Sequence, residues 1–212
     1  MRGITINNSI HTGNDLCLVM AEKNLPPPTV QTYSVSVPGR NGSVDLSEFL
    51  TGEVTYNNRT LSFKFIGDGS REHVLELIDE MLSYHGQKVE IIIDDYPDWY
   101  YTGRATVEYV DSGYYATFQL TVDAQPFSYA IRPKTYDFKV KGSRQISLYN
   151  CGVTVIPTVT VDKDTTIIKG QNTLRLSAGT YESSALKLLK GATLLIFEGD
   201  CNVTITYREA VI

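Results

Sequence analysis

At residues 37–46 the chain reads Val37-Pro38-Gly39-Arg40-Asn41-Gly42-Ser43-Val44-Asp45-Leu46, a stretch that predicts a hairpin. Alternating apolar residues precede it from Tyr33 to Val37, and this period of two predicts a half-buried strand. Pro38 cannot donate to a β-ladder, so the strand should end or lie at an edge there. Asn41-Gly42 is a strong hairpin-turn dipeptide, and the alternation resumes at Val44–Leu46. A long hairpin with a polar tip should therefore project early in the chain, into solvent or onto another subunit.

The residues around this hairpin predict an α+β domain. Apolar residues alternate from Leu61 to Phe65 and indicate a strand. From Ser70 the apolar spacing changes to three and four, which predicts one amphipathic helix over Ser70–Tyr84, with Ser70 or Asp68 as its N-cap and Gly86 just beyond its end. Further strands are expected at Gly3–Asn7, Asp15–Ala21, Val89–Ile93, Trp99–Tyr109 and Phe118–Val122. One helix packed on twisted antiparallel sheets, or on a split barrel, makes an α+β domain.

The remaining residues predict a second domain of different architecture. Residues 124–133 have prolines near both ends and no clean periodicity, which indicates a connector, so we place the domains at 1–132 and 133–212. Short strands follow, separated by glycines, at Tyr136–Val140, Gln145–Leu148, Thr158–Val161, Thr166–Ile168, Thr173–Leu176, Thr193–Phe197 and Val203–Tyr207. This pattern is typical of a β-sandwich or jelly roll. The whole chain should therefore be mainly β.

Composition and charge narrow the function classes. Apolar residues make up 42% and charged residues 20% of the chain, as in an ordinary soluble protein. Residues 1–132 hold 9 Lys/Arg and 17 Asp/Glu, a net charge of −8, while residues 133–212 hold 10 and 7, a net charge of +3. A nucleic-acid reader normally carries a basic domain, and the first domain is the reverse. No apolar signal segment follows Met1-Arg2 and no apolar run is long enough to span a bilayer, so we expect a soluble protein made in the cytosol, with no membrane partner.

The sequence offers no established catalytic or cofactor motif. There is no phosphate-binding GxxxxGK[ST] loop, no GxGxxG and no GxSxG elbow. The cysteines lie far apart and lack zinc-ligand spacing, which predicts free and mostly buried thiols; the histidines are expected to be solvated or capping. The residues concerned are Cys17, Cys151 and Cys201, and His11, His73 and His85. We therefore assign no catalytic, metal or cofactor-binding residue and expect no cofactor.

The acidic run Asp94–Asp98 is the strongest catalytic-looking feature. Carboxylates this close in sequence can bind a hard cation or perform acid/base chemistry, but the glycine and the distal glutamate of a calcium loop are missing. We therefore interpret the run as a solvated acidic turn between two strands. Trp99 and Tyr101 follow it on one face of a strand, where core packing is favoured over a stacking platform.

Several stretches occur in an order and spacing that resemble a known family. They are Pro38–Asp45 through Phe65, the helix Ser70–Tyr84 with Val89–Ile93, Tyr101–Arg104 and Ala124–Phe127, and then Asn150–Gly152, Ile156–Val161, Leu188–Ala192 and Asn202–Arg208. Together these stretches resemble the distal tail proteins of long-tailed bacteriophages, and the similarity covers nearly the whole chain. The resemblance implies an N-terminal domain that forms a ring and a C-terminal galectin-like jelly roll.

The resemblance also implies a function. The ring would be a homohexamer that continues the tail tube, joins it to the host-adhesion apparatus and lets DNA pass. Its partners would be the tail tube protein, the tape-measure protein and the tail-tip or receptor-binding proteins, and its location the virion. The acidic first domain suits a lumen that repels phosphates, so DNA should pass without specific binding. The hypothesised subunit interface is the hairpin tip, residues Pro38, Gly39, Arg40, Asn41, Gly42, Ser43 and Asp45.

Two other function classes stay open at this point. The first is a carbohydrate-binding adhesin, because jelly rolls often hold sugars. Residues 133–212 contain no tryptophan, although tyrosines are available at Tyr136, Tyr149, Tyr181 and Tyr207. The second is a small hydrolase that uses carboxylates, for which only the acidic run Asp94–Asp98 argues.

Overall fold

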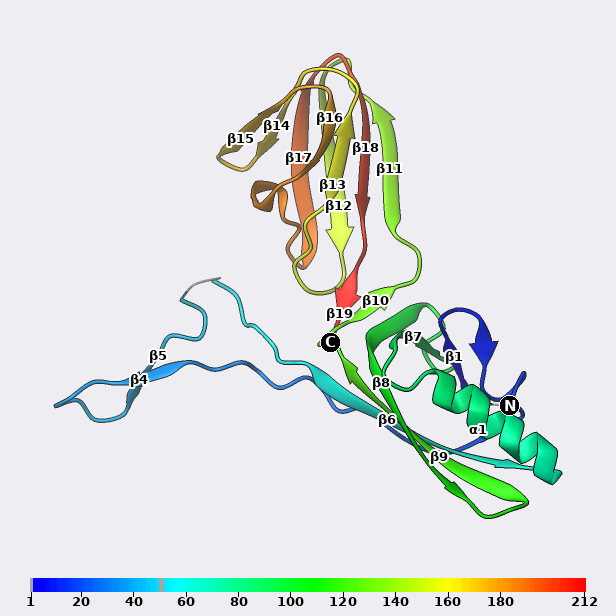
Figure 1. Cartoon of the computed structure of the whole chain (residues 1–212). Helices are drawn as coiled ribbons and strands as arrows, with labels where there is room; N and C mark the ends of the chain where they lie inside the picture. The colour runs from blue at the N-terminus through cyan, green and yellow to red at the C-terminus, as the bar shows by residue number, and fades with distance from the viewer. Residues whose placement is uncertain (1, 50–51) are drawn as a thin grey trace. The chain divides into compact units, whose positions relative to one another are not determined.

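The computed structural model describes residues 2–49 and 52–212, and the chain divides into two compact units, Met1–Ser128 and Tyr129–Ile212. Both units are built from antiparallel strands, with one α-helix in the first (Figure 1). The mainly β architecture expected from the sequence is confirmed. Within the described residues, no helix has the length and apolarity needed to cross a membrane.

The first unit is organised around one antiparallel sheet with the strand order β2-β1-β7-β8-β9-β6-β3. Its strands are β1 (Ile4–Ile6), β2 (Ile10–His11), β3 (Val19–Asn24), β6 (Arg59–Asp68), β7 (Lys88–Ile93), β8 (Trp99–Asp111) and β9 (Tyr115–Ala124). Side chains alternate between the two faces of each strand. On β6 the inward set, Leu61, Phe63 and Phe65, is fully buried, and on β9 Phe118 lies opposite Phe65 in the same core.

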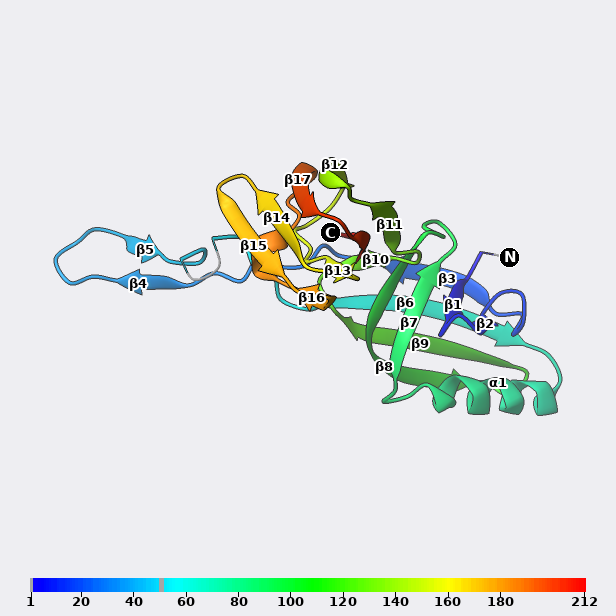
Figure 2. The same ribbon diagram turned by 90° about the horizontal axis from the view of Figure 1, so that it is seen from above.

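The helix α1 (Arg71–Ser83) covers the inner face of this sheet, where it contacts β6, β8 and β9 (Figure 2). Its buried residues are Val74, Leu77, Ile78 and Met81, the apolar stripe that the spacing predicts. The Ser70 side chain accepts a hydrogen bond from the His73 backbone N–H at 3.3 Å, so Ser70 is the N-cap. Gly86 has a φ of 77°, the left-handed conformation expected just past a helix end.

The predicted hairpin is present as a separate two-stranded sheet, β4 (Ser34–Ser36) and β5 (Ser43–Asp45). It extends away from the N-terminal end of β6 in both views of the ribbon (Figures 1 and 2). Residues 25–29, which include the three prolines, form no regular element. The hairpin is therefore carried on two long connections rather than packed on the sheet.

The second unit is a sandwich of two four-stranded sheets, ordered β11-β18-β13-β16 and β12-β17-β14-β15. Its elements are β10 (Ser128–Ala130), β11 (Lys134–Lys139), β12 (Gly142–Asn150), β13 (Thr158–Val161), β14 (Thr165–Lys169), β15 (Asn172–Leu176), β16 (Gly179–Glu182), the 3-10 turn η1 (Ser184–Leu186), β17 (Gly191–Gly199), β18 (Asn202–Tyr207) and β19 (Ala210–Val211). Inward side chains of both sheets form one core that includes Val159, Ile205, Leu195 and Phe197. The predicted β-sandwich is confirmed.

The structure corrects several boundaries. The strand expected at Asp15–Ala21 begins only at Val19, because residues before it turn: the Asp15 N–H bonds to the His11 carbonyl at 2.9 Å and Cys17 has a φ of 54°. The region expected to be a connector contains the short strand β10. The strand β16 escaped prediction, since Tyr181 is its only large apolar residue.

The thiols are free, as expected, but they are not uniformly buried. Cys201 is buried in the sandwich core, Cys151 is partly buried and Cys17 is exposed. Cys17 is exposed because it lies in the turn before β3 rather than on an inward position of a strand.

Candidate assembly surface

The tip of the hairpin is shaped by a turn at Val37–Arg40. The Arg40 N–H donates to the Val37 carbonyl at 3.1 Å, and Gly39 has a φ of 80°. Proline at the second position of a turn, followed by a residue with positive φ, is the type II pattern. The hydrogen-bonded turn thus lies at Pro38-Gly39, whereas the prediction put it at Asn41-Gly42. Pro38 decides this, because its ring fixes φ at the first corner of the turn.

The base of the hairpin is closed by a cluster of hydrogen bonds. The Leu46 N–H donates to the Tyr33 carbonyl at 2.8 Å, and the Tyr33 N–H donates to the Ser47 hydroxyl at 2.8 Å. Ser47 in turn donates to the Asp45 carboxylate from its hydroxyl, at 2.5 Å, and from its backbone N–H, at 2.9 Å. These two bonds lower the pKa of the Asp45 carboxyl. Asp45 therefore stabilises the hairpin itself, which its proposed role at an interface had not anticipated.

The two faces of the hairpin differ in chemistry. One face, here called the hairpin face, consists of Tyr33, Val35, Val37, Val44 and Leu46. Val35 lies opposite Val44, and Tyr33 is 64% exposed. The other face carries Ser34, Ser36, Ser43 and Asp45. The first strand was expected to be half-buried, but every residue of β4 is exposed, and only Val44 and Leu46 of the hairpin face are partly buried.

Six of the seven predicted interface residues lie together at the distal end of the hairpin, whereas Asp45 lies at its base, opposite Ser34. Pro38, Gly39, Arg40, Asn41, Gly42, Ser43 and Asp45 are all exposed. Within residues 2–49 and 52–212, Arg40 makes no ion pair. The prediction stressed the polar tip and missed the apolar hairpin face. The signal for that face was the alternation from Tyr33 to Val37, which predicted a half-buried strand.

Arg59, at the root of the hairpin, is a buried cation. Its side chain is 7% exposed, its Nη1 donates to the Pro26 carbonyl at 3.5 Å, and its guanidinium lies 4.7 Å from the centroid of the Tyr101 ring. Its Nε and Nη2 are buried and have no hydrogen-bond partner among the described residues. Sequence reasoning did not single out Arg59, because a strand residue flanked by polar neighbours gives no sign of burial.

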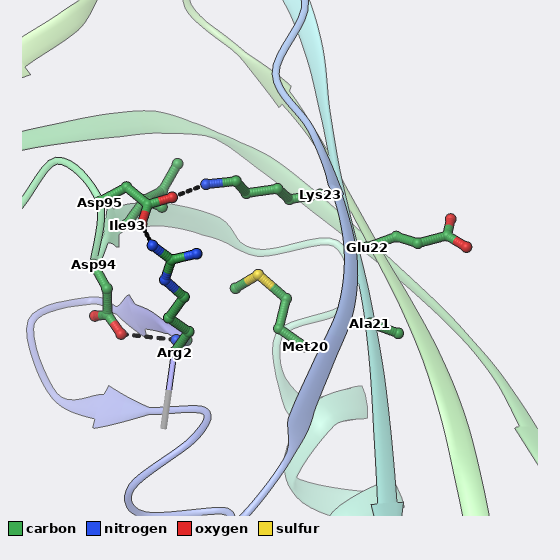
Figure 3. Close-up of a pocket in the computed structure, with 9 residues that line it drawn as sticks. Arg2, Met20, Ala21, Glu22, Lys23, Ile93, Asp94 and Asp95 are labelled. Atoms are coloured by element: carbon green, nitrogen blue, oxygen red, sulfur yellow. Dashed lines mark hydrogen bonds and ion pairs between the residues drawn. The ribbon is translucent and has the colours of Figure 1, made fainter.

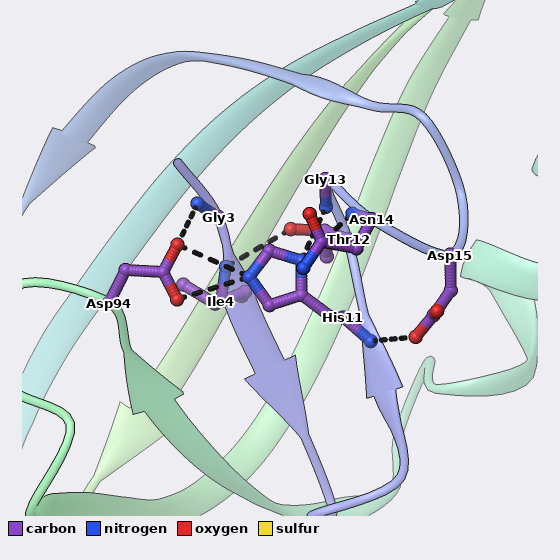
Figure 4. A network of polar contacts seen from close by, with 8 residues as sticks. All are labelled: Gly3, Ile4, His11, Thr12, Gly13, Asn14, Asp15 and Asp94. Carbon is purple, nitrogen blue, oxygen red and sulfur yellow. Dashed lines mark hydrogen bonds and ion pairs between the residues drawn. The ribbon is translucent and has the colours of Figure 1, made fainter. Parts of the chain in front are cut away.

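The acidic run at Asp94–Asp98 is held by structural contacts. Asp94 accepts hydrogen bonds from the Gly3 N–H at 2.7 Å and from His11 Nε2 at 3.0 Å (Figure 4). His11 Nδ1 accepts from the backbone N–H groups of Gly13 and Asn14 at 3.1 and 2.9 Å. Since both imidazole nitrogens are engaged in fixing the N-terminal turn, this histidine–aspartate pair is a brace between β2 and the turn after β7.

Asp95 has a separate set of partners. It pairs with Arg2 at 3.3 Å and with Lys23, across a cavity of about 190 Å³ between β3 and the turn after β7 (Figure 3). The run is an exposed turn between β7 and β8, as expected, and within it Asp94 and Asp95 also accept hydrogen bonds or ion pairs from neighbouring N–H groups and cations. Within the described part of the chain, no group of three or more His, Cys, Asp or Glu is arranged to hold a metal ion.

The second unit has a polar cavity of about 270 Å³. Its lining residues are Asp164, Thr165, Thr166, Arg175, Leu176, Ser177 and Glu198, which include no aromatic ring for stacking on a sugar. Of the tyrosines considered for that role, Tyr207 is 3% exposed and stacks on Tyr136 inside the sandwich. These contacts do not favour the adhesin alternative.

Comparison with known proteins identifies solved structures with a similar fold. No protein-family model matches the chain, and no curated protein matches it. Among solved structures it is similar to the Dit (gp 19.1) protein of SPP1, described as a paradigm of the hub adsorption apparatus in phages that infect Gram-positive bacteria. The two structures match with a TM-score of 0.64 and 16% sequence identity, and the match covers 98% of this chain and 99% of that chain. The baseplate of phage p2 in its activated conformation also matches, with a TM-score of 0.44, 8% identity and 98% of each chain. The chain has a Dit-like fold, and the resemblance to distal tail proteins is confirmed at the level of the fold.

Proposed function

We propose that the chain is a structural protein of a phage tail tip, a distal tail protein that joins the tail tube to the host-adhesion apparatus and is not an enzyme. The observation that carries this proposal is the likeness to the SPP1 hub protein, which extends over 98% of this chain and 99% of that one. A match over both units supports a role for the chain as a whole rather than for one module. In this role the protein is made in the bacterial host and becomes part of the virion.

In the proposed assembly the first unit forms a closed homohexameric ring, and the hairpin of each copy lies across its neighbour. The hairpin supports this: its apolar face is largely exposed within its own unit, and its backbone is ordered by its own hydrogen bonds. A head-to-tail contact that closes on itself gives a ring. The partners are the tail tube protein, the tape-measure protein and the tail-tip or receptor-binding proteins.

The charge of the first domain supports a lumen through which DNA passes. Residues 1–132 carry a net charge of −8 in each copy. Proteins that hold DNA neutralise its phosphates with Lys and Arg and release counterions, and an acidic wall prevents such binding. DNA should therefore slide through the ring without being retained.

The test is the size and shape of the purified protein, and of a variant without the hairpin. Because the Leu46 N–H already bonds to the Tyr33 carbonyl, an Asn-Gly turn in place of Ser34–Asp45 should close the shortened chain without strain. We expect a six-lobed ring of the wild type in negative stain, and a lower mass for the variant by light scattering with an unchanged melting temperature. A wild type that is monomeric at every accessible concentration would contradict self-assembly.

A further inference from the structure

A second uncovered apolar surface lies on the outer face of the sheet in the first unit. Val19 on β3 is opposite Ile66 on β6, Ile66 is opposite Thr117 on β9, and Thr117 is opposite Val110 on β8. Because residues in register share a face, this row crosses four strands on the side away from α1. Val110 is 65% exposed, Val19 52% and Ile66 39%. Tyr115, two residues before Thr117 on the same face, extends the row, and we call Val19, Ile66, Val110 and Tyr115 the sheet patch.

The sheet patch is unlike the rest of that face. Further along the same strands the outward residues are polar or charged, as is normal for a face in water: Glu22, Lys64, Gln119 and Glu108 form the next row, and Asn24, Ser62, Thr121 and Thr106 the one after it. Large exposed aliphatic side chains grouped on adjacent strands, with a polar rim, mark an interaction site.

The rim of the sheet patch is acidic. Asp68 lies opposite Tyr115 at one side, and Glu108 and Glu22 lie in the next row at the other, with Lys64 4.0 Å from Glu22. Arg40 at the hairpin tip is an exposed cation that makes no ion pair within the described residues. The hairpin thus offers an apolar stripe with a positive tip, and the sheet patch an apolar row with a negative rim.

We infer that the sheet patch of one copy is the seat for the hairpin face of the next copy. A ring needs a heterologous contact between two different surfaces of the same chain, and these two surfaces are apolar, uncovered and complementary in charge. Two copies of the sheet patch facing each other would bring their acidic rims together, so the hairpin of a neighbour is the better partner. This inference rests on the proposed ring and names the residues that hold it.

Charge substitution tests the sheet patch. Val110→Asp places a carboxylate in the apolar row, next to the acidic rim, and should lower the oligomer mass at a given concentration by light scattering. Leu194→Asp is the matched control, since Leu194 is an aliphatic residue on β17, 48% exposed, and lies in the second unit. Circular dichroism melts of the first variant should match the wild type. An unchanged mass for Val110→Asp, with both proteins folded, would overturn the inference.

Cross-linking between copies tests the contact directly. In a Cys17→Ser background, Val35→Cys marks the hairpin face and Val110→Cys marks the sheet patch. Mixing the two single variants under oxidising conditions should give a disulfide-linked dimer of hairpin variant with sheet variant that disappears on reduction. The background protein without either introduced cysteine is the control. Each variant alone should give little dimer, because the hairpin does not meet a second hairpin.

The outcomes separate this inference from the proposed function. A six-lobed ring without the mixed cross-link would overturn the seat and leave the ring proposal standing. The mixed cross-link in open filaments, with no closed ring, would support the seat and overturn the ring. Self-linked hairpin variants would indicate a two-fold contact and overturn both.

Discussion

At the scale of single residues, Arg59 is a poorly compensated buried charge in the first unit. A buried donor without an acceptor costs about 1–3 kcal/mol, whereas a cation over an aromatic ring contributes about 0.5–2 kcal/mol. Arg59 has two such donors and one ring, Tyr101. The cation is thus expected to contribute little net stability, or to reduce it.

We therefore predict that Arg59→Met preserves or raises the free energy of unfolding, by up to about 2 kcal/mol, because methionine keeps the packing and removes the unpaired donors. Arg59→Lys is the matched control: it keeps the charge, loses the planar stack on Tyr101 and should lower the stability. Denaturant titrations of the three proteins measure this. A loss of more than about 2 kcal/mol for Arg59→Met would show that the guanidinium has an acceptor that balances its charge.

Glu209 is a buried charged residue in the second unit, and unlike Arg59 its charge is well compensated by hydrogen bonds. It is 7% exposed and accepts hydrogen bonds from Lys134 Nζ at 2.7 Å and from the Cys151 N–H at 2.9 Å. Burial by itself would raise the pKa of Glu209, but the bonds from Lys134 and Cys151 outweigh it and lower that pKa. The folded second unit therefore favours the charged carboxylate.

A lowered carboxyl pKa makes stability depend on pH. Its contribution is complete above the unfolded pKa and is lost as the pH falls through the folded pKa, so the melting temperature should drop from about pH 5 downward. Glu209→Gln should lose about 1–3 kcal/mol at pH 7 and flatten this acid limb. Glu198→Gln, at an exposed position of β17, is the control and should keep the wild-type profile. Identical acid limbs for Glu209→Gln and the wild type would contradict the assignment.

At the scale of elements, α1 shows how much the sequence determines locally. Its N-cap, apolar stripe and terminal glycine are encoded within 17 consecutive residues, from Ser70 to Gly86, and all were predicted.

We predict that Ser70→Ala lowers the free energy of unfolding by about 1 kcal/mol, because the His73 N–H loses its acceptor. Ser83→Ala at the other end, where the Ser83 hydroxyl bonds to the Glu80 carbonyl, should have a smaller effect in the same urea titration. Equal effects would show that the cap is not a source of stability.

The hairpin shows what a sequence cannot determine alone. Alternation at Tyr33–Val37 fixes which side chains share a face, but it does not say what covers them, since that depends on the rest of the unit. The same limit applies to the sheet patch. Val110 and Ile66 are 44 positions apart in the sequence, Ile66 and Val19 are 47 apart, and they share one face only through strand register. Short-range signals such as Pro38-Gly39 and Asn41-Gly42 compete within the hairpin, and the proline ring decided between them.

At the scale of the whole molecule, the first residues of the second unit are tied to its C-terminal segment. The Ala130 N–H donates to the Glu209 carbonyl at 2.9 Å, and Arg208 Nη1 donates to the carbonyls of Ala130 and Ile131 at 2.6 and 2.8 Å. These bonds involve Ala130 and Ile131, which precede residue 133, where the sequence predicts that the second domain begins. The core of the sandwich, by contrast, begins at Tyr136 and Val140 and does not involve them.

We therefore predict that residues 133–212 fold alone, and that residues 129–212 fold with a higher melting temperature. The longer fragment keeps three connector hydrogen bonds, each worth about 1 kcal/mol. Arg208→Met removes two of them and should lower the melting temperature of the longer fragment while changing the shorter one less, because the Ala130 and Ile131 carbonyls are absent from the shorter fragment. Differential scanning calorimetry of the four proteins makes the comparison. If residues 133–212 show no cooperative transition, the boundary at 132 is wrong. If the two fragments have the same melting temperature, the connector hydrogen bonds do not stabilise the second unit, because its strands alone then account for its stability.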